Sequence, residues 1–251
     1  MVENKRVQLN PRFPMPTIAI LPSRLIVTSI VNSMDFLGLT NLADKLLSDC
    51  TSDSRKSEIL NAKTKKFYLH GLKNLEDGDL HGAVKNFSCA IEINPDFAPA
   101  YNDRGITRYK LGYKLLALED LTTAIDINPE RDKYYNNRGF ILSRLEDYPA
   151  AIADYSLAVL LNPYASKSYF RRGTIYLKID DYVAAMADFD SAIRITPDFG
   201  KAYFNRGIAK YNLKDIPGGF EDFQKSAELF KAQDKIEDYH EAVAKITELW
   251  Y

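Results

Sequence analysis

One pattern of residues returns five times in this chain, at intervals of 34 residues. In each copy an aromatic residue is followed, at fixed spacings, by Gly, Ala, a large apolar residue, a second Ala and Pro. The copies are Phe67/Gly71/Ala83/Phe87/Ala90/Pro95, Tyr101/Gly105/Ala117/Leu121/Ala124/Pro129, Tyr135/Gly139/Ala151/Tyr155/Ala158/Pro163, Tyr169/Gly173/Ala185/Phe189/Ala192/Pro197 and an incomplete fifth, Tyr203/Gly207/Gly219/Phe223/Ser226. A fixed period of this length is typical of stacked supersecondary units. Because no catalytic residue type repeats with the pattern, we expect the function to lie in a binding surface.

The spacing within each copy indicates how one unit folds. Numbered from residue 64, positions 1–14 and 17–30 of each repeat have helical periodicity, and a short polar turn separates them. Gly at position 8 and Ala at position 20 lack bulk, so two antiparallel helices can approach closely there, and the large residues at positions 4 and 24 fill the wider gaps. Pro at position 32 ends the second helix. The sequence therefore predicts an all-α fold of stacked helix pairs.

The pattern divides the chain into three parts. We assign residues 1–60 to an N-terminal extension, an extended arm followed by short helices, with a polar loop or helix cap at residues 51–56. This extension could cap the stack, fill its groove or bind separately. Residues 61–233 contain repeats 1 to 5, at residues 64–97, 98–131, 132–165, 166–199 and 200–233. Residues 234–251 predict a C-terminal capping helix with an apolar face of Ile236, Tyr239, Ala242, Val243, Ile246, Leu249 and Trp250.

Composition excludes several classes of function. The formal net charge is −1, which argues against binding nucleic acid through the charge of the whole molecule. No run of about 18 apolar residues exists, so we expect no membrane span. Two cysteines, Cys50 and Cys89, do not make a disulfide framework and favour a reducing compartment such as the cytoplasm. The apolar stretch at residues 17–31 leaves peripheral membrane association open.

No residues are arranged for catalysis or for holding a cofactor. The three histidines, His70, His81 and His240, do not lie at metal-ligand spacing from Cys or carboxylate residues. The glycines follow the repeat and form no phosphate-binding loop. We therefore expect no enzymatic activity, no cofactor and no metal site.

Positions 4, 8, 20, 24, 27 and 32 of the repeats resemble the tetratricopeptide repeat family, and the resemblance covers about residues 61–233. It implies a right-handed superhelix of helix pairs with a concave groove lined by the first helices. It also implies that the groove binds a peptide segment of another protein. It implies neither an enzyme nor a particular partner.

One departure from the family pattern predicts an ion pair. Position 7, where the family usually has Leu, is Arg in repeats 2 to 5, and position 23 is Asp in the same repeats. In repeat 1 both positions change together, to His70 and Asn86. We predict that each Arg pairs with the Asp of its own repeat: Arg104 with Asp120, Arg138 with Asp154, Arg172 with Asp188 and Arg206 with Asp222.

The family resemblance places positions 2, 5, 6, 9, 12 and 13 of the first helices in the groove. These positions are basic at the groove edges and carry aromatic or amide side chains along its floor, whereas the second helices carry many of the acidic residues. We therefore expect an extended partner segment with acidic and apolar residues. The predicted partner-binding residues are Lys133, Asn136, Asn137, Phe140, Lys167, Phe170, Arg171, Lys201, Phe204, Tyr109, Lys110 and Arg144.

A narrower hypothesis concerns a carboxylate clamp. Some cochaperones of the family hold a C-terminal carboxylate with five residues from three repeats. Three of these five are present here, as Asn137, Lys167 and Arg171. Asn102 and Ile106 stand where the clamp has Lys and Asn. A contact with a single carboxylate at the three matching residues is the more general alternative.

We expect a protein–protein interaction scaffold or assembly cofactor. The Asn-Arg-Gly triplets at residues 137–139 and 205–207 resemble those of cyanobacterial and plastid family members, several of which help to assemble photosynthetic membrane complexes. This resemblance implies the plastid stroma as the alternative location to the cytoplasm. The alternative is a helical-repeat protein that binds single-stranded RNA. The strict 34-residue period and the near-neutral charge argue against this alternative, and filter binding with a mixed oligonucleotide pool would distinguish the two.

Overall fold

The computed structural model describes the backbone of residues 40–248 and the side chains of residues 55–248. The chain divides into two compact units, residues 1–59 and residues 60–251. The predicted extended arm lies outside the described residues, as do Leu249 and Trp250 of the predicted cap. Within residues 40–248, no helix combines the length and the apolar composition that crossing a bilayer requires.

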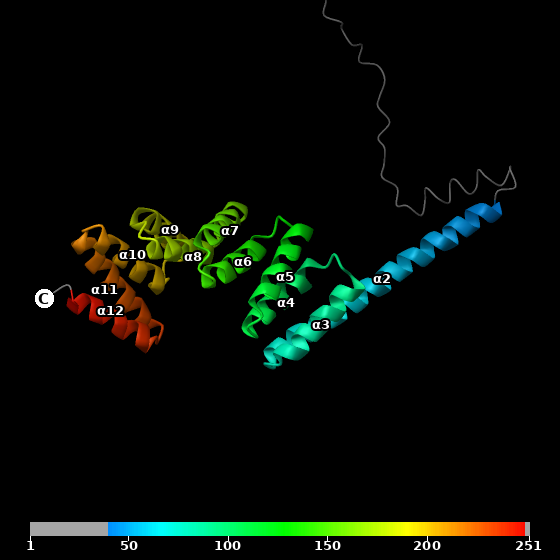
Figure 1. The fold of residues 1–251 in the computed structure, drawn as a ribbon, viewed down its shortest axis with the longest axis horizontal. Helices are drawn as coiled ribbons and strands as arrows, with labels where there is room; N and C mark the ends of the chain where they lie inside the picture. Colours follow the sequence, from blue (N-terminus) through cyan, green and yellow to red (C-terminus); the bar gives the residue numbers. More distant parts are fainter. Residues whose placement is uncertain (1–39, 249–251) are drawn as a thin grey trace, which may run out of the picture. The chain divides into compact units, whose positions relative to one another are not determined.

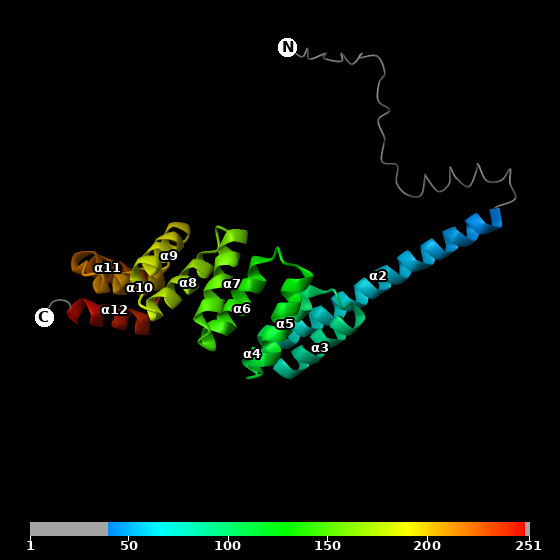
Figure 2. The ribbon, with the colours of Figure 1, turned by 45° about the horizontal axis from the view of Figure 1, so that its top comes forward.

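All regular elements of the described part are α-helices, and consecutive helices pack in pairs (Figures 1 and 2). The helices are α2 Thr40–Glu76, α3 Leu80–Ile93, α4 Ala98–Lys110, α5 Lys114–Ile127, α6 Asp132–Arg144, α7 Tyr148–Leu161, α8 Ser166–Lys178, α9 Tyr182–Ile195, α10 Gly200–Asn212, α11 Ile216–Ala232 and α12 Ile236–Glu248. In repeats 2 to 5 the first helices are α4, α6, α8 and α10. Contacts join α4 to α6, α6 to α8 and α8 to α10, so the first helices share one side of the stack.

Helix α2 is longer than the sequence predicts. It runs for 37 residues without interruption, through the polar loop expected at residues 51–56, so that prediction is wrong. This segment, Thr-Ser-Asp-Ser-Arg-Lys, contains neither Gly nor Pro, and each of its residues costs less than about 0.7 kcal/mol relative to Ala in a helix. Polar composition alone therefore does not end the helix.

The residues of the repeated pattern form the interior of the stack. In repeat 4, Ala185, Phe189 and Ala192 have no exposed surface. A Cβ atom placed on Gly173 of the same repeat would lie 2.9 Å from the Phe189 ring, which is closer than packed atoms allow. The small residue at position 8 is thus required by the close approach of the two helices, as the spacing predicts.

Acidic residues begin several second helices. Asp79, Asp147, Asp181 and Asp215 each accept a hydrogen bond on the side chain from a backbone N–H in the first turn of the helix that follows. In repeat 2 the same position is Tyr113, and α5 has no side-chain cap. Such caps satisfy backbone donors that the helix leaves free, and they fix where each second helix starts.

Four Arg–Asp pairs join the helices of repeats 2 to 5, which confirms the predicted ion pairs. Each carboxylate accepts from Nε and Nη2 of its Arg. The Nη2 to Oδ1 distances are 2.7, 2.8, 2.7 and 2.6 Å for Arg104–Asp120, Arg138–Asp154, Arg172–Asp188 and Arg206–Asp222. Burial raises the pKa of the Asp188 carboxyl, and the hydrogen bonds from Arg172 oppose this shift. The same bonds raise the pKa of Arg172, which keeps its guanidinium charged. The buried pair is therefore ionised.

The four arginines also bind the preceding repeat, which the sequence analysis missed. Nη1 of each Arg donates to a side chain at position 25 of that repeat, namely Ser88, Thr122, Ser156 and Asp190. Each Arg therefore holds one helix pair together and attaches that pair to the one before it.

Helix α12 packs against the last repeat. Ala242 is fully buried, and Tyr239, Val243 and Ile246 pack with it against Ala227 and Phe230 of α11. Ile236 differs from the prediction, because its side chain is 52 % exposed at the start of the helix and does not join this face. The apolar contact begins one turn later than the sequence pattern indicates.

Candidate functional site

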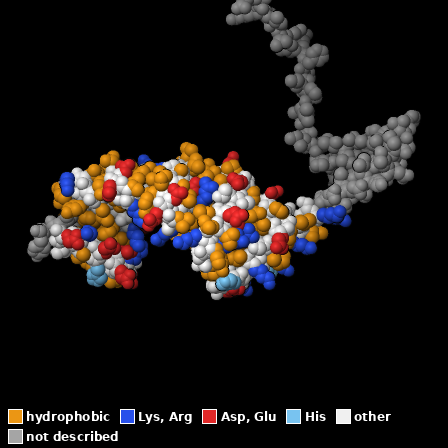
Figure 3. Space-filling model, in the orientation of Figure 1, with side chains coloured by type: hydrophobic (Ala, Val, Ile, Leu, Met, Phe, Trp, Pro, Cys, Tyr) orange, Lys and Arg blue, Asp and Glu red, His pale blue; other side chains and the backbone are white. Residues whose placement is uncertain are grey.

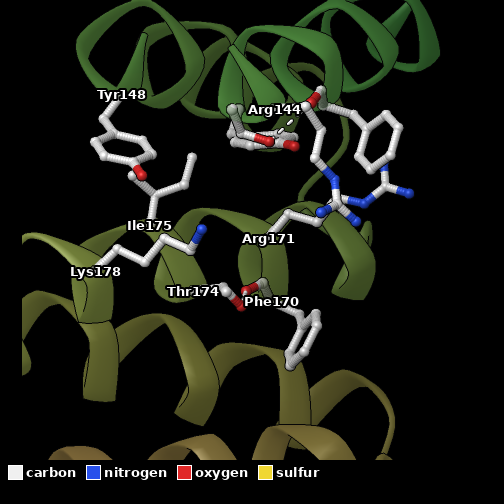
Figure 4. Close-up of a pocket in the computed structure, with 10 residues that line it drawn as sticks. Arg144, Tyr148, Phe170, Arg171, Thr174, Ile175 and Lys178 are labelled. Carbon is white, nitrogen blue, oxygen red and sulfur yellow. Dashed lines mark hydrogen bonds between the residues drawn. The ribbon is translucent and has the colours of Figure 1, made fainter. Parts of the chain in front are cut away.

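A pocket of about 280 Å³ lies between α6 and α8, and we call it the α6–α8 pocket (Figure 4). It is lined by residues of repeats 3 and 4: Phe140, Ser143, Arg144, Tyr148, Tyr155, Phe170, Arg171, Thr174, Ile175 and Lys178. The polar side chains at its edge are fixed locally, since the Ser143 hydroxyl donates to the Phe140 carbonyl at 2.8 Å and the Thr174 hydroxyl to the Phe170 carbonyl at 2.8 Å. The pocket thus combines an aromatic floor with charged residues at its rim.

Three cations, Arg144, Arg171 and Lys178, line this pocket, and no carboxylate does. Nη1 of Arg171 donates to Oδ1 of Asn136 at 2.7 Å, which directs the guanidinium across α6. None of the three cations forms an ion pair with any residue among those that the structure describes. Their charge is therefore available to an external anion.

The cations lie over aromatic rings. The guanidinium carbons of Arg144 and Arg171 are 5.5 and 5.0 Å from the centroid of the Phe140 ring, and the Lys178 ammonium is 5.8 Å from the centroid of the Tyr148 ring. Figure 4 shows Arg144 and Arg171 entering from facing helices, with Lys178 and Tyr148 on the other side of the pocket. The attraction of a cation to a ring face offsets part of the repulsion between these like charges.

Tyr155 forms the buried wall of the pocket, and its side chain is almost fully enclosed. Burial raises the pKa of the Tyr155 hydroxyl to about 12, although the positive charge of Arg171 and a hydrogen bond with Ser143 act in the opposite direction. Loss of the hydroxyl proton would place a negative charge in this interior. The phenol is therefore neutral at physiological pH and contributes an apolar surface with one polar edge.

Four of the twelve predicted partner-binding residues line the α6–α8 pocket: Phe140, Arg144, Phe170 and Arg171. Asn136 is bonded to Arg171, and the Tyr109 ring packs edge-on against Phe140 with the centroids 5.6 Å apart. These two predicted residues therefore support the pocket from the side of repeat 2 without lining it.

The other six predicted residues lie elsewhere. Lys133 and Lys201 already have acidic partners, since their ammonium groups are 3.7 Å from Asp103 and 3.3 Å from Asp238. Phe204 packs into the contact between α10, α11 and α12, with its ring 5.4 Å from that of Phe223. Lys110 and Lys167 are exposed. The sixth residue, Asn137, is hydrogen-bonded to Asn102 of the preceding repeat.

The predicted carboxylate clamp is not gathered in this pocket. Of its three matching residues only Arg171 lines the pocket. Nδ2 of Asn137 donates to Oδ1 of Asn102 in the preceding repeat at 2.8 Å, and Asn102 is buried. The amides at these positions connect neighbouring first helices, and this interior hydrogen bond already uses the Asn137 amide.

Six lining residues were missing from the predicted set: Ser143, Tyr148, Tyr155, Thr174, Ile175 and Lys178. Tyr148 and Tyr155 belong to a second helix, which the family resemblance does not assign to the groove. Lys178 occupies position 13, the position of Arg144 in the preceding repeat, so the sequence contained a signal for this residue. The sequence does not show that the pocket reaches α7, and this is why Tyr148 and Tyr155 were not predicted.

A second pocket occupies the corresponding place in repeat 5, and we call it the α10–α12 pocket. It also has a volume of about 280 Å³, and Ile208, Tyr211, Asn212 and Phe223 fill the repeat positions of Phe140, Ser143, Arg144 and Tyr155. Its remaining lining residues, Lys245 and Glu248, form an ion pair with each other at 2.7 Å. This pocket therefore has no uncompensated charge.

The surface of the repeat unit also shows positive charge near the α6–α8 pocket. Figure 3 shows one face on which the stack is hollowed beneath α6 and α8, and Lys and Arg side chains gather at the rim of that hollow. Among the residues that the structure describes, no cluster of His, Cys, Asp and Glu could hold a metal ion.

Comparison with known proteins finds the same helical repeat that the structure shows. The tetratricopeptide repeat family model matches residues 132–164 and 166–199, the two repeats that form the α6–α8 pocket. Tetratricopeptide repeat protein 36 of Danio rerio is 37 % identical over 81 residues, which are 32 % of this chain and 42 % of that protein, so the match spans less than half of the relative.

Solved structures share the fold. A crystal structure of MamA aligns with a TM-score of 0.62 and 22 % identity, covering 66 % of this chain and 96 % of that one. YrrB, described as a TPR protein with an unusual peptide-binding site, aligns with a TM-score of 0.57 and 18 % identity, covering 65 % and 84 %. At this level of identity the likeness concerns the arrangement of helices.

Proposed function

Because this chain is a tetratricopeptide repeat protein, we propose that it acts as a scaffold that holds an extended segment of another protein along its first helices. Proteins of this family generally mediate protein–protein interactions. The segment would lie across α4, α6 and α8, with its central residues at the α6–α8 pocket. YrrB, which has the same fold, is described as having a peptide-binding site, and this supports the proposed mode of action.

One observation carries the proposal. The α6–α8 pocket has three cations without an acidic partner above an aromatic floor, and the corresponding α10–α12 pocket has none. A partner segment with acidic residues beside a large apolar residue matches both properties. Complementary charge of this kind selects the partner and speeds its association more than it raises affinity.

Charge along the neighbouring helices extends the site. Lys110 at the end of α4 and Lys167 at the start of α8 are exposed, and no ion pair is found for either within the described residues. Lys110 adds positive charge on the helix before the pocket, and Lys167 adds it on α8, which lines the pocket. A partner of about ten residues in an extended conformation would span about 33 Å, enough to reach several repeats.

The Asn-Arg-Gly triplets have a structural explanation. Arg138 binds Asp154 and Thr122, and Asn137 binds Asn102 of the preceding repeat. Gly139 lies where the helices approach closely, because an added Cβ would be 3.2 Å from Tyr155. Packing accounts for this triplet, so the proposal extends to assembly of a multi-subunit complex in general rather than to a photosynthetic one.

The test uses the full-length protein and fluorescent peptide pools. A pool of twelve-residue peptides rich in Glu and Phe should bind more tightly than a pool with Lys in place of Glu, as measured by fluorescence anisotropy. Arg144→Ala with Arg171→Ala should weaken binding about tenfold or more, which corresponds to the loss of about 1.4 kcal/mol. Lys65→Ala with Lys73→Ala, which removes two charges from α2, should leave binding unchanged.

Two results would contradict the proposal. The first is equal binding of the acidic and basic pools. The second is tight binding of a mixed single-stranded RNA pool that Arg144→Ala with Arg171→Ala weakens, since this would favour the RNA-binding alternative.

A further inference from the structure

We infer that the α6–α8 pocket binds a phosphorylated side chain of the partner segment, an inference that rests on the proposed function. The proposed function requires an acidic and apolar peptide. The charges and hydrogen-bond donors of this pocket indicate which anionic group lies at its centre.

The charge of the pocket exceeds what one carboxylate can neutralise. Arg144, Arg171 and Lys178 contribute three positive charges, and the ten lining residues include no Asp or Glu. A peptide carboxylate brings one negative charge and two oxygens. A phosphorylated Ser, Thr or Tyr brings a charge of about −1.5 to −2 at pH 7 and three acceptor oxygens. The phosphate is therefore the better match in charge.

The available donors point to the same group. Nη1 of Arg171 is occupied by Asn136 at 2.7 Å, which orients the guanidinium and leaves its other N–H groups for a ligand. No hydrogen bond from the Arg144 guanidinium or from the Lys178 ammonium is found among the described residues. Two planar guanidinium groups from facing helices, both over the Phe140 ring, can donate to the oxygens of one phosphate, and the Lys178 ammonium adds positive charge across the pocket.

Comparison of the repeats shows that packing does not require this charge. Position 6 is Arg only in repeat 4, as Arg171, and is Leu69, Asp103, Asn137 and Asn205 in the other repeats. In the α10–α12 pocket, position 13 is Asn212, and the one cation, Lys245, is paired with Glu248. Two pockets of equal volume at the same place in the repeat thus differ in uncompensated positive charge, which only the α6–α8 pocket has.

The rest of the lining suits the side chain that carries the phosphate. Tyr148, Tyr155, Phe170 and Ile175 provide an apolar wall beside the cations. Because Arg144 and Arg171 both lie over the Phe140 ring, their charges are held at the rim rather than dispersed in solvent. The phosphate would lie at this rim, and the carbon atoms of its side chain would contact the wall.

The experiment compares three peptide pools with the full-length protein at 150 mM salt. Each pool has twelve residues rich in Glu and Phe, and the central residue is Ser, Glu or phosphoserine, with phosphotyrosine as a further arm. We expect the phosphorylated pools to bind about tenfold more tightly than the pool with central Glu, because a phosphate carries a charge of about −1.5 to −2 and three acceptor oxygens, against one charge and two oxygens for Glu. Equal affinity for phosphoserine and Glu overturns the inference.

A pair of matched variants locates the effect. Arg171→Asn installs the residue that repeats 3 and 5 carry at this position and should remove the preference for phosphate. Lys110→Asn removes a cation at the same repeat position as Arg144 but outside the pocket, so it should weaken all pools equally and keep the preference. Circular dichroism checks that both variants are folded.

The outcomes separate this inference from the proposed function. If the Ser and Glu pools bind as well as the phosphorylated ones, the scaffold proposal stands and the phosphate inference fails. If no pool binds, both fail. Binding of vesicles with phosphoinositide lipids, sensitive to Arg171→Asn, without binding of any phosphopeptide would show that the phosphate belongs to a membrane and would also overturn the inference.

Discussion

The α6–α8 and α10–α12 pockets have the same volume and the same place in the repeat, yet their chemistry differs. In the first, three cations have no acidic partner, and the buried residue at position 24 is Tyr155. In the second, the single cation is paired and the residue at position 24 is Phe223. The repeat pattern sets the shape of a pocket, and a few positions on the first helices decide what the pocket can bind.

The two regions share their support. The α8–α9 pair beneath the first pocket and the α10–α11 pair beneath the second are each joined by a buried Arg–Asp pair. Four predictions, from the largest expected effect to the smallest, test which properties the two regions share and which they do not.

Removing a buried carboxylate should cost the most in either region. Asp222→Ala removes the buried partner that Arg206 and Lys210 share, so the free energy of unfolding should fall by about 3 kcal/mol in urea titrations. Asp190→Ala removes the exposed partner of the same Arg206 and should cost less than about 1 kcal/mol. Equal costs for the two variants would show that burial of the pair is unimportant.

High pH should lower the free energy of unfolding through Tyr155, whereas Phe223, at the same repeat position, has no group that titrates. The unfolded chain loses the Tyr155 proton near pH 10, whereas the folded protein retains it to about pH 12. The stabilisation is complete below pH 10 and is lost as the pH rises to 12, by about 2 kcal/mol for this residue. Tyr155→Phe should make the decline in stability between pH 10 and pH 12 shallower, and an unchanged slope would contradict the burial of this phenol.

Adding uncompensated charge to the α10–α12 pocket should create a second binding site. Asn212→Arg with Glu248→Gln gives the α10–α12 pocket two uncompensated cations, one new and one released from its ion pair. We expect this variant to bind a second equivalent of the acidic peptide pool, within about tenfold of the affinity of the first site. Isothermal titration calorimetry reports the stoichiometry, and a stoichiometry of one would show that charge alone does not make the site.

The smallest effect should come from position 27, which is Ala in repeats 1 to 4 and Ser226 in repeat 5. The Ser226 hydroxyl is buried without a hydrogen-bond partner in the described structure. Ser226→Ala should therefore raise the free energy of unfolding by about 1 kcal/mol, and Ala192→Ser in repeat 4 should lower it by about the same amount. A loss of stability on Ser226→Ala would indicate that the hydroxyl is satisfied in solution.

The fold could be predicted because the repeat states it five times. Gly173 and Phe189 show why. A residue larger than Gly at position 173 would collide with the Phe189 ring, and this steric requirement produces the constant spacing between positions 8 and 24 of each repeat. The Arg–Asp pairs were visible for a similar reason, because both residues change together in repeat 1. Their second set of bonds, to position 25 of the preceding repeat, depends on how the units stack and leaves no comparable signal.

The candidate site could be predicted only in part. Arg144 and Arg171 followed from the family's groove positions, but the sequence does not show which cations already have partners. Lys133 and Lys201 resemble them in sequence and differ only in the acids that lie nearby in space. The helix through residues 51–56 was missed because a polar segment without Gly or Pro can be either a loop or a helix.

The central claim is that an acidic peptide binds at the uncompensated cations between α6 and α8. Arginine side-chain NMR of the full-length protein tests it most directly, by following the Nε–Hε signals during titration with the Glu- and Phe-rich pool. The account predicts that the signals of Arg144 and Arg171 shift in proportion to binding while that of Arg206, committed to Asp222 and Asp190, stays in place. Saturable binding that leaves the Arg144 and Arg171 signals unmoved would contradict it.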